Sequence, residues 1–335
     1  MMGKDLLKTE EAIAFVKESF TSSLSEKLKL HKVSSPLVVL DETGINDDLS
    51  GVERAVSFPV KALQDKRAVV VHSLAKWKRI RLKDFEIEEG IGILTDMKAL
   101  RPDEDYSHLH SIYVDQWDWE VRMNPKQRTL SYLKETVGRI YDAMLETEKA
   151  VHVKYQEITP SLPKSITYIH SEELLMRYPN ITPKQREHEA AKEYGAIFLI
   201  GIGNKLSSGE PHDGRAPDYD DWSTLNEDGY IGLNGDIIVW HSELQEAVEL
   251  SSMGIRVNKH VMEQQLKERK CEERSQFMYH RMILEELLPQ SIGGGIGQSR
   301  LCMFFLKRKH IGEVQVSVWS DKQKLSLEVE GVFLL

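Results

Sequence analysis

The stretch IGGGIGQSR, Ile292 to Arg300, places four glycines and one arginine in nine residues near the end of a 335-residue chain. Glycines at alternate positions (Gly293, Gly295 and Gly297) predict a strand with one face free of side chains, on which a planar base can lie. An arginine that follows such a strand can bind phosphate through its planar fork. A glycine-rich hairpin beside a surface arginine is the alternative interpretation of the same letters.

Two phosphate-binding loops of known mechanism do not fit this stretch. The Walker loop needs Lys-Ser or Lys-Thr after its last glycine, whereas Gln298, Ser299 and Arg300 follow here. The dinucleotide fingerprint needs its glycines in the first turn between a strand and a helix, with an acidic residue about 20 positions later. The stretch lies near the C-terminus and has different spacing, so its neighbours must decide its role.

A second informative stretch is MKALRPDEDYSHLHSIYVDQWDWE, residues 97–120, which places Arg101 at the end of one predicted strand. On the next strand, three polar residues alternate with two tryptophans: Gln116, Asp118 and Glu120, with Trp117 and Trp119. Burying such a polar face costs free energy unless it meets a ligand. A half-exposed edge strand over a tryptophan-lined core is the alternative.

The composition predicts one large globular domain and disfavours several classes of protein. Hydrophobic residues make up 41% of the chain and charged residues 29%, which are globular values. The formal net charge of -9 argues against a nucleic-acid partner, because phosphate backbones select for clustered lysine and arginine. No apolar run is long enough for a membrane span or a signal peptide, so we expect a cytoplasmic protein without a membrane partner.

Cysteines and histidines give little support for a metal centre or a disulfide framework. Cys271 and Cys302 share no CxxC motif, and Cys302, in the apolar run LCMFFL, is expected to be a core thiol. Four histidines, namely His72, His110, His170 and His212, lack the mutual spacing of zinc ligands.

The periodicity of the chain predicts an α+β fold with a mainly antiparallel sheet. A first helix begins at Thr9 and buries the stripe Ile13, Val16, Phe20 and Leu24. The predicted strands are 33–40, 68–72, 109–117, 165–170, 195–203, 235–241 and 314–319. The further predicted helices are 127–156, 182–194, 242–250, 261–270 and 272–287, and residues 321–335 look unconstrained. Several strands follow one another directly, which favours an antiparallel sheet over a doubly wound parallel one.

Four stretches together resemble the signature motifs of class II aminoacyl-tRNA synthetases. IGGGIGQSRLCMFFL, residues 292–306, resembles the third motif, in which alternating glycines end on an arginine that holds the phosphate tail of ATP. RPDED with LHSIYVDQWDWE, within 101–120, resembles the second motif, whose arginine contacts the α-phosphate and the acyl carboxylate. KLHKVSSPLVV, residues 29–39, resembles the first motif, whose proline, here Pro36, lies at a dimer interface. AVELSSMGIRV, residues 247–257, is similar to a segment of aspartyl and asparaginyl synthetases that carries a metal-binding glutamate.

Three shorter stretches narrow the resemblance to the family of ammonia-dependent asparagine synthetases. They are INDDLSG, HSLAKWKR and APDYDDW, residues 45–51, 72–79 and 216–222. The resemblance implies a class II synthetase-like catalytic core as one domain over 1–335, with no anticodon-binding domain and no glutaminase domain. The implied reaction converts aspartate and ATP into β-aspartyl-AMP and pyrophosphate, and attack by free ammonia then gives asparagine and AMP. The implied partners are aspartate, ATP, ammonia, Mg²⁺ and a second copy of the chain in a homodimer.

An alternative is a truncated aspartyl- or asparaginyl-tRNA synthetase paralogue that transfers an amino acid to another acceptor. Such a protein needs a basic docking surface, and a formal net charge of -9 does not indicate one. A catalytically dead paralogue would have lost the phosphate-binding arginines, yet Arg101 and Arg300 are both present.

The resemblance and the chemistry of the reaction assign roles to individual residues. The residues expected to act in catalysis are Arg101, Gln116, Asp47, Lys78 and Asp220. Those expected to bind aspartate are Asp47, Ser73, Lys78, Gln116, Asp118 and Ser252. Those expected to bind ATP are Arg101, His110, Arg215, Gly293, Gly294, Gly295 and Arg300, and those expected to hold Mg²⁺ are Asp236 and Glu249.

The main assignments rest on matching charge and hydrogen-bonding groups. Arg101 is expected to bridge the β-carboxylate and the α-phosphate, and Arg300 to hold the γ-phosphate. Gln116 can donate to the β-carboxyl oxygen without adding charge. Asp47 and Lys78 offer the anion and the cation that the ammonium and α-carboxylate of aspartate need, and we expect each to be paired by substrate.

Two roles remain open at this stage. One aspartate of the run Asp218, Asp220 and Asp221 is expected to take a proton from ammonium, although a solvated acidic turn explains the run equally well. The adenine-stacking position of the second motif falls near Val114, with Tyr113 beside it.

Overall fold

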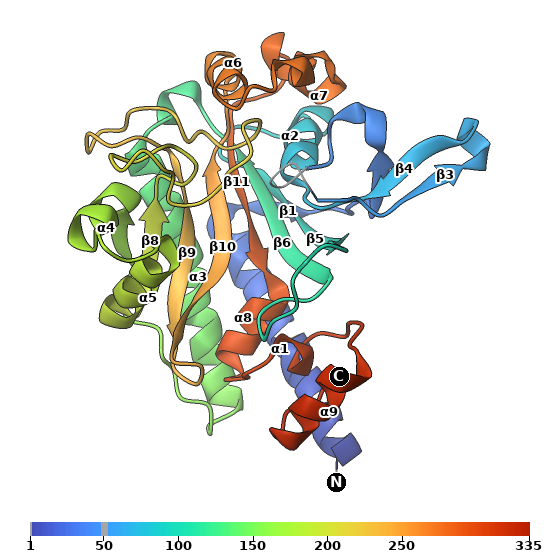
Figure 1. Cartoon of the computed structure of the whole chain (residues 1–335), viewed down its shortest axis with the longest axis vertical. Helices are drawn as coiled ribbons and strands as arrows, with labels where there is room; N and C mark the ends of the chain where they lie inside the picture. Colours follow the sequence, from blue (N-terminus) through green and yellow to red (C-terminus); the bar gives the residue numbers. More distant parts are fainter. Residues whose placement is uncertain (1, 48–52) are drawn as a thin grey trace.

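A computed structural model of the chain describes residues 2–47 and 53–335, and shows a broad sheet with helices packed on it (Figure 1). The stretch INDDLSG therefore lies partly outside the described residues. No helix in the described part of the chain is long and apolar enough to cross a membrane.

The main sheet has eight strands in the order β1-β5-β6-β11-β10-β9-β8-β7. Only the outermost pairs, β1 with β5 and β7 with β8, are parallel, which confirms the prediction of a mainly antiparallel α+β fold. A small sheet of order β2-β4-β3 projects from one side of the body (Figure 1). The strands are β1 Leu30–Lys32, β2 Val38–Leu40, β3 Ser57–Val60, β4 Lys66–Val70, β5 Gly92–Leu100, β6 Tyr113–Arg122, β7 Thr167–His170, β8 Ala196–Ile200, β9 Asn234–His241, β10 Glu246–Ile255 and β11 Ser291–Gly297.

Helices pack against both faces of the main sheet. The α-helices are α1 Met2–Leu28, α2 Ala75–Asp84, α3 Leu130–Lys154, α4 Ser171–Arg177, α5 Pro183–Tyr194, α6 Lys259–Glu268, α7 Met278–Leu284, α8 Gln298–Phe305 and α9 Asp321–Val329. The short 3₁₀ turns are Asp41–Thr43, Lys61–Leu63, Pro125–Gln127, Glu272–Gln276 and Ile311–Glu313. Helices α1, α3 and α8 share one hydrophobic core with the sheet, whereas α2 contacts β6 and β11 from the other face.

Packing in the hydrophobic core confirms two predictions made from the sequence. The predicted apolar stripe of the first helix is buried in full, and Phe20 lies edge-on to Trp117, with ring centroids 4.7 Å apart. Trp117 and Trp119 both face this core, so the polar residues between them must face the opposite side of the sheet. Cys302 is buried in the same core, and burial raises the pKa of its thiol to about 12, which confirms a core role.

Three element predictions were wrong. Residues 242–250 were expected to be a helix because glutamate, leucine and alanine favour helices, but β10 begins there at Glu246 and pairs with both β9 and β11. Residues 314–319 form no strand, and Val316 and Val318 are exposed. Residues 321–335 looked unconstrained, yet Ser320 caps α9 through a capping box with Gln323.

Candidate active site

The polar face of β6 lies beside the bare face of β11. The strand register places Gln116 opposite Gly297, Asp118 opposite Gly295 and Glu120 opposite Gly293. A Cβ atom on Gly295 would lie 2.5 Å from Oε1 of Gln116. The alternating glycines therefore form a strand with one side-chain-free face, followed directly by helix α8, as the sequence predicts.

One glycine of this face does not reach the site, which corrects an expectation. A Cβ on Gly293 would lie 1.9 Å from Oε2 of Glu120 and 2.6 Å from a nitrogen of Arg256. Gly293 is therefore covered by this ion pair, whereas Gly294, Gly295 and Gly297 line the cavity. A nucleotide floor can use Gly295 and Gly297, but Gly293 makes room for a buried salt bridge.

Glu120 is satisfied by protein groups and not by a ligand. Its carboxylate is fully buried, accepts from Nη2 of Arg256 at 2.8 Å and from the hydroxyl of Ser291 at 2.7 Å. Burial is the largest influence and opposes its ionisation, but the charge and hydrogen bonds of Arg256, together with Lys78 and Ser291, lower the pKa of Glu120. Arg256 also donates to Asp220, so it connects the main sheet to the loop that carries Asp220.

Lys78 has partners within the protein, contrary to the expectation that only substrate would pair it. Its ammonium group, 1% exposed, donates to Asp118 and to the carbonyl oxygen of Gly294, the latter at 2.7 Å. Burial lowers the pKa of Lys78 although Asp118 opposes the shift. Lysine has three N–H donors, so one remains for a ligand. The Oδ2 atom of Asp118 is buried without a hydrogen-bond partner in the described chain.

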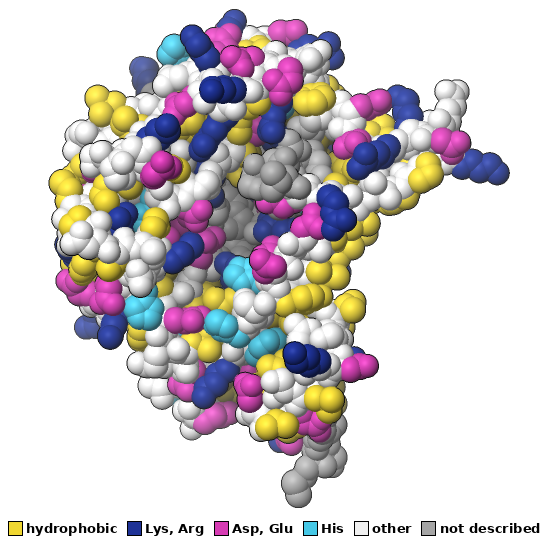
Figure 2. All heavy atoms as spheres, viewed as in Figure 1, with side chains coloured by type: hydrophobic (Ala, Val, Ile, Leu, Met, Phe, Trp, Pro, Cys, Tyr) yellow, Lys and Arg dark blue, Asp and Glu magenta, His cyan; other side chains and the backbone are white. Residues whose placement is uncertain are grey.

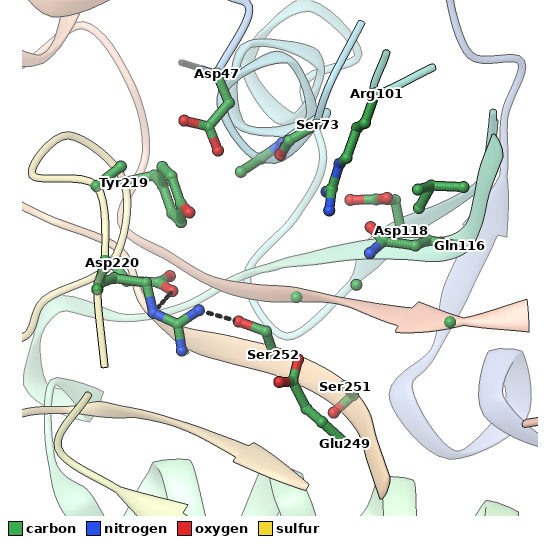
Figure 3. Close-up of a pocket in the computed structure, with 18 of the residues that line it drawn as sticks. Asp47, Ser73, Arg101, Gln116, Asp118, Tyr219, Asp220, Glu249, Ser251 and Ser252 are labelled. Carbon is green, nitrogen blue, oxygen red and sulfur yellow. Dashed lines mark hydrogen bonds and ion pairs between the residues drawn. The ribbon is translucent and has the colours of Figure 1, made fainter. Parts of the chain in front are cut away.

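These residues line a cavity of about 850 Å³ on the face of the sheet away from the core. Figure 2 shows it as a hollow ringed by side chains of both charges. In the close-up of Figure 3, Asp47, Ser73 and Arg101 approach from one side, while Gln116 and Asp118 lie on β6 and Ser252 on β10. The structure thus brings together the expected aspartate-binding residues Asp47, Ser73, Lys78, Gln116, Asp118 and Ser252.

Two arginines face the cavity with part of their donors unused. Arg101 donates through Nη2 to the carbonyl oxygen of His72 at 3.3 Å, and its Nε has no partner among residues 2–47 and 53–335. Arg300 donates to the carbonyl oxygen of Glu249 at 3.0 Å and to Nε2 of His110 at 2.7 Å. Burial and the charge of Arg300 lower the pKa of His110 to about 4, so its ring is neutral near pH 7 and can accept this bond.

Arg215 links the expected metal ligands to the aspartate site. Its guanidinium donates to Asp236 at 2.6 Å and to the hydroxyl of Ser252. Burial raises the pKa of Asp236 to about 7, against the charge of Arg215 and with that of nearby Glu249. The described residues contain no group of three or more histidine, cysteine or carboxylate side chains that can hold a metal.

The acidic run is buried, so its interpretation as a solvated turn was wrong. Asp218, Asp220 and Asp221 are each at most 1% exposed. Asp221 pairs with Arg128 and Asp218 with Lys76, away from the cavity. Asp220 lines the cavity, but its two oxygens face Arg256 and Arg215. This arrangement favours positioning of two arginines over transfer of a proton.

Sequence reasoning missed two further residues of the site. Arg256 anchors Glu120 and Asp220, and its signal was its place in AVELSSMGIRV, a stretch in which only Glu249 and Ser252 were assigned roles. Tyr219 lines the cavity, and burial raises its pKa well above the ordinary value. Tyr113 and Val114 both line the cavity, so the choice between them as the adenine-stacking residue is unchanged.

The fold is that of the class II aminoacyl-tRNA synthetases. The asparaginyl-tRNA synthetase of Pyrococcus horikoshii, in complex with asparaginyl-adenylate, superposes with a TM-score of 0.68 at 14% identity, covering 92% of this chain and 68% of that one. The asparaginyl-tRNA synthetase of Entamoeba histolytica gives a TM-score of 0.65 at 12% identity, with 93% and 66% covered.

The sequence places the chain in one family within this class. The profile of the family described as aspartate-ammonia ligase matches residues 7–331. A relative named aspartate–ammonia ligase from Parabacteroides distasonis is 54% identical over 99% of this chain and 96% of its own length. One from Fusobacterium nucleatum is 54% identical over 95% and 94%. The chain belongs to the aspartate–ammonia ligase family.

Proposed function

We propose that the protein makes asparagine from aspartate, ammonia and ATP through β-aspartyl-AMP, and releases AMP and pyrophosphate. Amide formation from a carboxylate and ammonia is unfavourable in water, so the carboxylate must first receive a leaving group. The observation that carries the proposal is that Gln116, Arg101 and Arg300 line one cavity together with glycines of β11. Family membership supports the substrates aspartate and ammonia.

The arginines suit the adenylation step. Arg101 has donors left after its bond to His72, so its planar fork can span the β-carboxylate and the α-phosphate while charge builds at phosphorus. Arg300 is held by Glu249 and His110, which fixes its guanidinium to receive the γ-phosphate. Gln116 donates to the carboxyl oxygen that remains on carbon.

Aspartate can be oriented by charges already present in the cavity. The third donor of Lys78 suits its α-carboxylate, and the unpartnered oxygen of Asp118 suits its ammonium group. Asp47, which is 2% exposed and lines the same cavity, supplies further negative charge near this ammonium. The hydroxyl groups of Ser73 and Ser252 complete the polar wall.

Asp236 and Glu249 fit a Mg²⁺ ion that is shared with ATP. Burial is the main cause of the raised pKa of Asp236, and the charge of Glu249 adds to it; a divalent cation that binds both carboxylates would relieve this repulsion. Two carboxylates with phosphate oxygens as the other ligands are typical of Mg²⁺. The bound ion would neutralise charge on the phosphates of ATP.

The test is an assay with three acceptors. Protein, ATP, Mg²⁺ and aspartate are incubated with ammonium, glutamine or transfer RNA, and products are separated. We expect asparagine only with ammonium, together with one AMP for each asparagine. Aminoacylated RNA without asparagine would replace this proposal with the truncated-synthetase alternative.

A further inference from the structure

One lysine at the edge of the active-site cavity has no role in the chemistry proposed above. Lys184, near the start of α5, lines the cavity with a side chain that is 64% exposed, so it lies where the cavity meets solvent. Among the described residues that line this cavity, Lys78 is the other lysine, and it is buried beside Asp118. Lys184 is therefore a lysine at the cavity edge that is still open to a ligand from solvent.

The charges around Lys184 place it at the end of the cavity where the phosphates of ATP are expected. Partial burial lowers the pKa of Lys184, but nearby carboxylates, Glu249 among them, raise it overall, so the amine is protonated near pH 7. Burial and then the charge of Arg300 lower the pKa of His110, and the charge of Lys184 adds to this shift. Figure 3 shows Glu249 across the cavity from Asp47. Lys184 thus lies near the groups proposed to hold Mg²⁺ and the γ-phosphate.

The present partners of Lys184 leave it free to bind a phosphate oxygen. Its Nζ donates to Oε2 of Glu187 at 3.1 Å and lies 3.3 Å from Oδ2 of Asp213. Glu187 is buried and also lies 3.0 Å from Nε2 of His212, so this contact is anchored. The side chain of Asp213 is 51% exposed, and exposed ion pairs are weak because water screens them. Lysine has three N–H donors, so a phosphate oxygen can use the third or displace Asp213.

Electrostatics favours an anion between Lys184 and the expected Mg²⁺ site. A lysine beside a divalent cation is repelled by it unless negative charge lies between them, and the β- and γ-phosphates supply that charge. We propose that Lys184 binds the terminal phosphates of ATP and the pyrophosphate that adenylation releases. The inference rests on the asparagine-forming activity proposed above.

The adenylation step shows what Lys184 contributes. An oxygen of the β-carboxylate attacks the α-phosphorus, and the bond from this phosphorus to the oxygen that bridges to the β-phosphate breaks. The electron pair of that bond stays on pyrophosphate, so the leaving group gains negative charge. The protonated amine of Lys184 offsets this charge together with Arg300, and no proton is transferred.

The first test measures aspartate-dependent exchange of pyrophosphate into ATP, with inhibition by AMP as a second readout. Lys184→Met keeps an unbranched side chain and removes its charge. We expect the KM for pyrophosphate to rise about tenfold or more, as for one lost hydrogen bond to a charged ligand, while the affinity for AMP, which lacks these phosphates, stays within about twofold. Lys192→Met, at an exposed lysine in the last turn of the same helix, is the matched control and should change neither value.

Two further variants separate phosphate binding from a purely structural role. If Lys184 only holds the loop of Asp213 against α5, Asp213→Asn should weaken pyrophosphate binding as much as Lys184→Met does. We expect instead an unchanged or lower KM for pyrophosphate in Asp213→Asn, because Lys184 loses a competing carboxylate. Lys184→Arg keeps the positive charge and should restore most of the affinity that Lys184→Met loses.

The outcomes that would overturn the inference are distinct from those that would overturn the proposed function. Because Lys184 is largely exposed, all four variants should melt near the parent temperature. An unchanged KM for pyrophosphate in Lys184→Met, an equal loss of AMP and pyrophosphate affinity, or an Asp213→Asn variant that matches Lys184→Met would each overturn the inference while exchange in the parent protein persists. Absence of exchange in the parent protein would overturn the proposed function and this inference with it.

Discussion

At the scale of single residues, the site is built from charges that the protein itself pairs. Lys78 and Asp118 are 1% and 2% exposed and contact each other, so the two charges are paired before substrate binds. Removing one partner of such a pair leaves the other buried and unpaired, which costs about 3–5 kcal/mol. This cost makes the pair a structural as well as a substrate-binding element.

A prediction follows for this pair. Lys78→Met should lower the melting temperature clearly and abolish aspartate-dependent pyrophosphate exchange, because it strands the carboxylate of Asp118. Adding Asp118→Asn removes the stranded charge and should restore much of the stability but not the exchange. Thermal melts and exchange assays on both single variants and the double variant form the cycle. Strictly additive melting shifts would show that the two side chains do not interact.

The sequence could predict which residue types meet at the site, but not how they divide their contacts. Gln116, Asp118 and Glu120 alternate on one strand, and this pattern identified the polar face correctly. It could not reveal that Arg256, more than 130 positions away, neutralises Glu120 and covers Gly293. Spacing along a strand is a local signal, whereas charge pairing depends on the order of strands in the sheet.

At the scale of elements, strand β11 has two faces with different needs. A Cβ on Gly294 would lie 2.5 Å from Cβ of Met253 and 2.7 Å from the carbonyl oxygen of Ser252 on β10. A Cβ on Gly295 would instead meet the mobile end of Gln116. Gly294 is therefore needed for the close approach of β11 to β10, and Gly295 for the position of the Gln116 side chain.

Alanine at each glycine should separate these needs. Gly294→Ala is expected to destabilise the fold by about 1–3 kcal/mol, since backbone and Cβ atoms must move apart. Gly295→Ala should melt near the parent temperature but raise the KM for aspartate, because Gln116 is displaced. Melting curves and steady-state kinetics on the two variants distinguish the faces. An early melt of Gly295→Ala with normal kinetics would mean that this glycine also serves packing.

The wrong predictions for residues 242–250 and 314–319 have one cause: the availability of a neighbouring strand, and not local sequence preference, decided whether each segment became a strand. Residues 242–250 contain good helix formers, but β9 and β11 offer hydrogen-bond partners on both sides of β10, and this tertiary pairing outweighs local preference. Residues 314–319 have the β-branched pattern of a strand, yet no strand of the described chain lies beside them. Gln315 from this segment bonds Ser111 and Ser299 next to the cavity.

At the scale of the whole molecule, the small sheet presents a free edge. Strand β2 pairs only with β4 among the described residues, and it follows Pro36 of the first motif. Leu37 and Val38 are 54% and 39% exposed there. An exposed apolar edge strand is a template for pairing with another chain, which supports the homodimer that the family resemblance implies.

The dimer is testable by mass in solution. Light scattering should give twice the chain mass of 38.5 kDa for the parent protein. Leu37→Glu combined with Val38→Glu should shift the mass toward the monomer, because two buried charges would face each other across the interface. Leu325→Glu, at a residue of α9 that is 65% exposed, is the matched control and should stay dimeric. A monomeric parent protein would contradict the expected homodimer.

The proposed reaction requires a β-aspartyl-AMP intermediate in the cavity floored by β11. Its most direct test is the fate of oxygen from aspartate labelled with ¹⁸O in the β-carboxylate. The intermediate joins one carboxylate oxygen to the α-phosphorus, and attack by ammonia on carbon leaves that oxygen behind. We therefore expect one ¹⁸O atom in each AMP released, which mass spectrometry detects. Unlabelled AMP, or ADP with the label in inorganic phosphate, would contradict it.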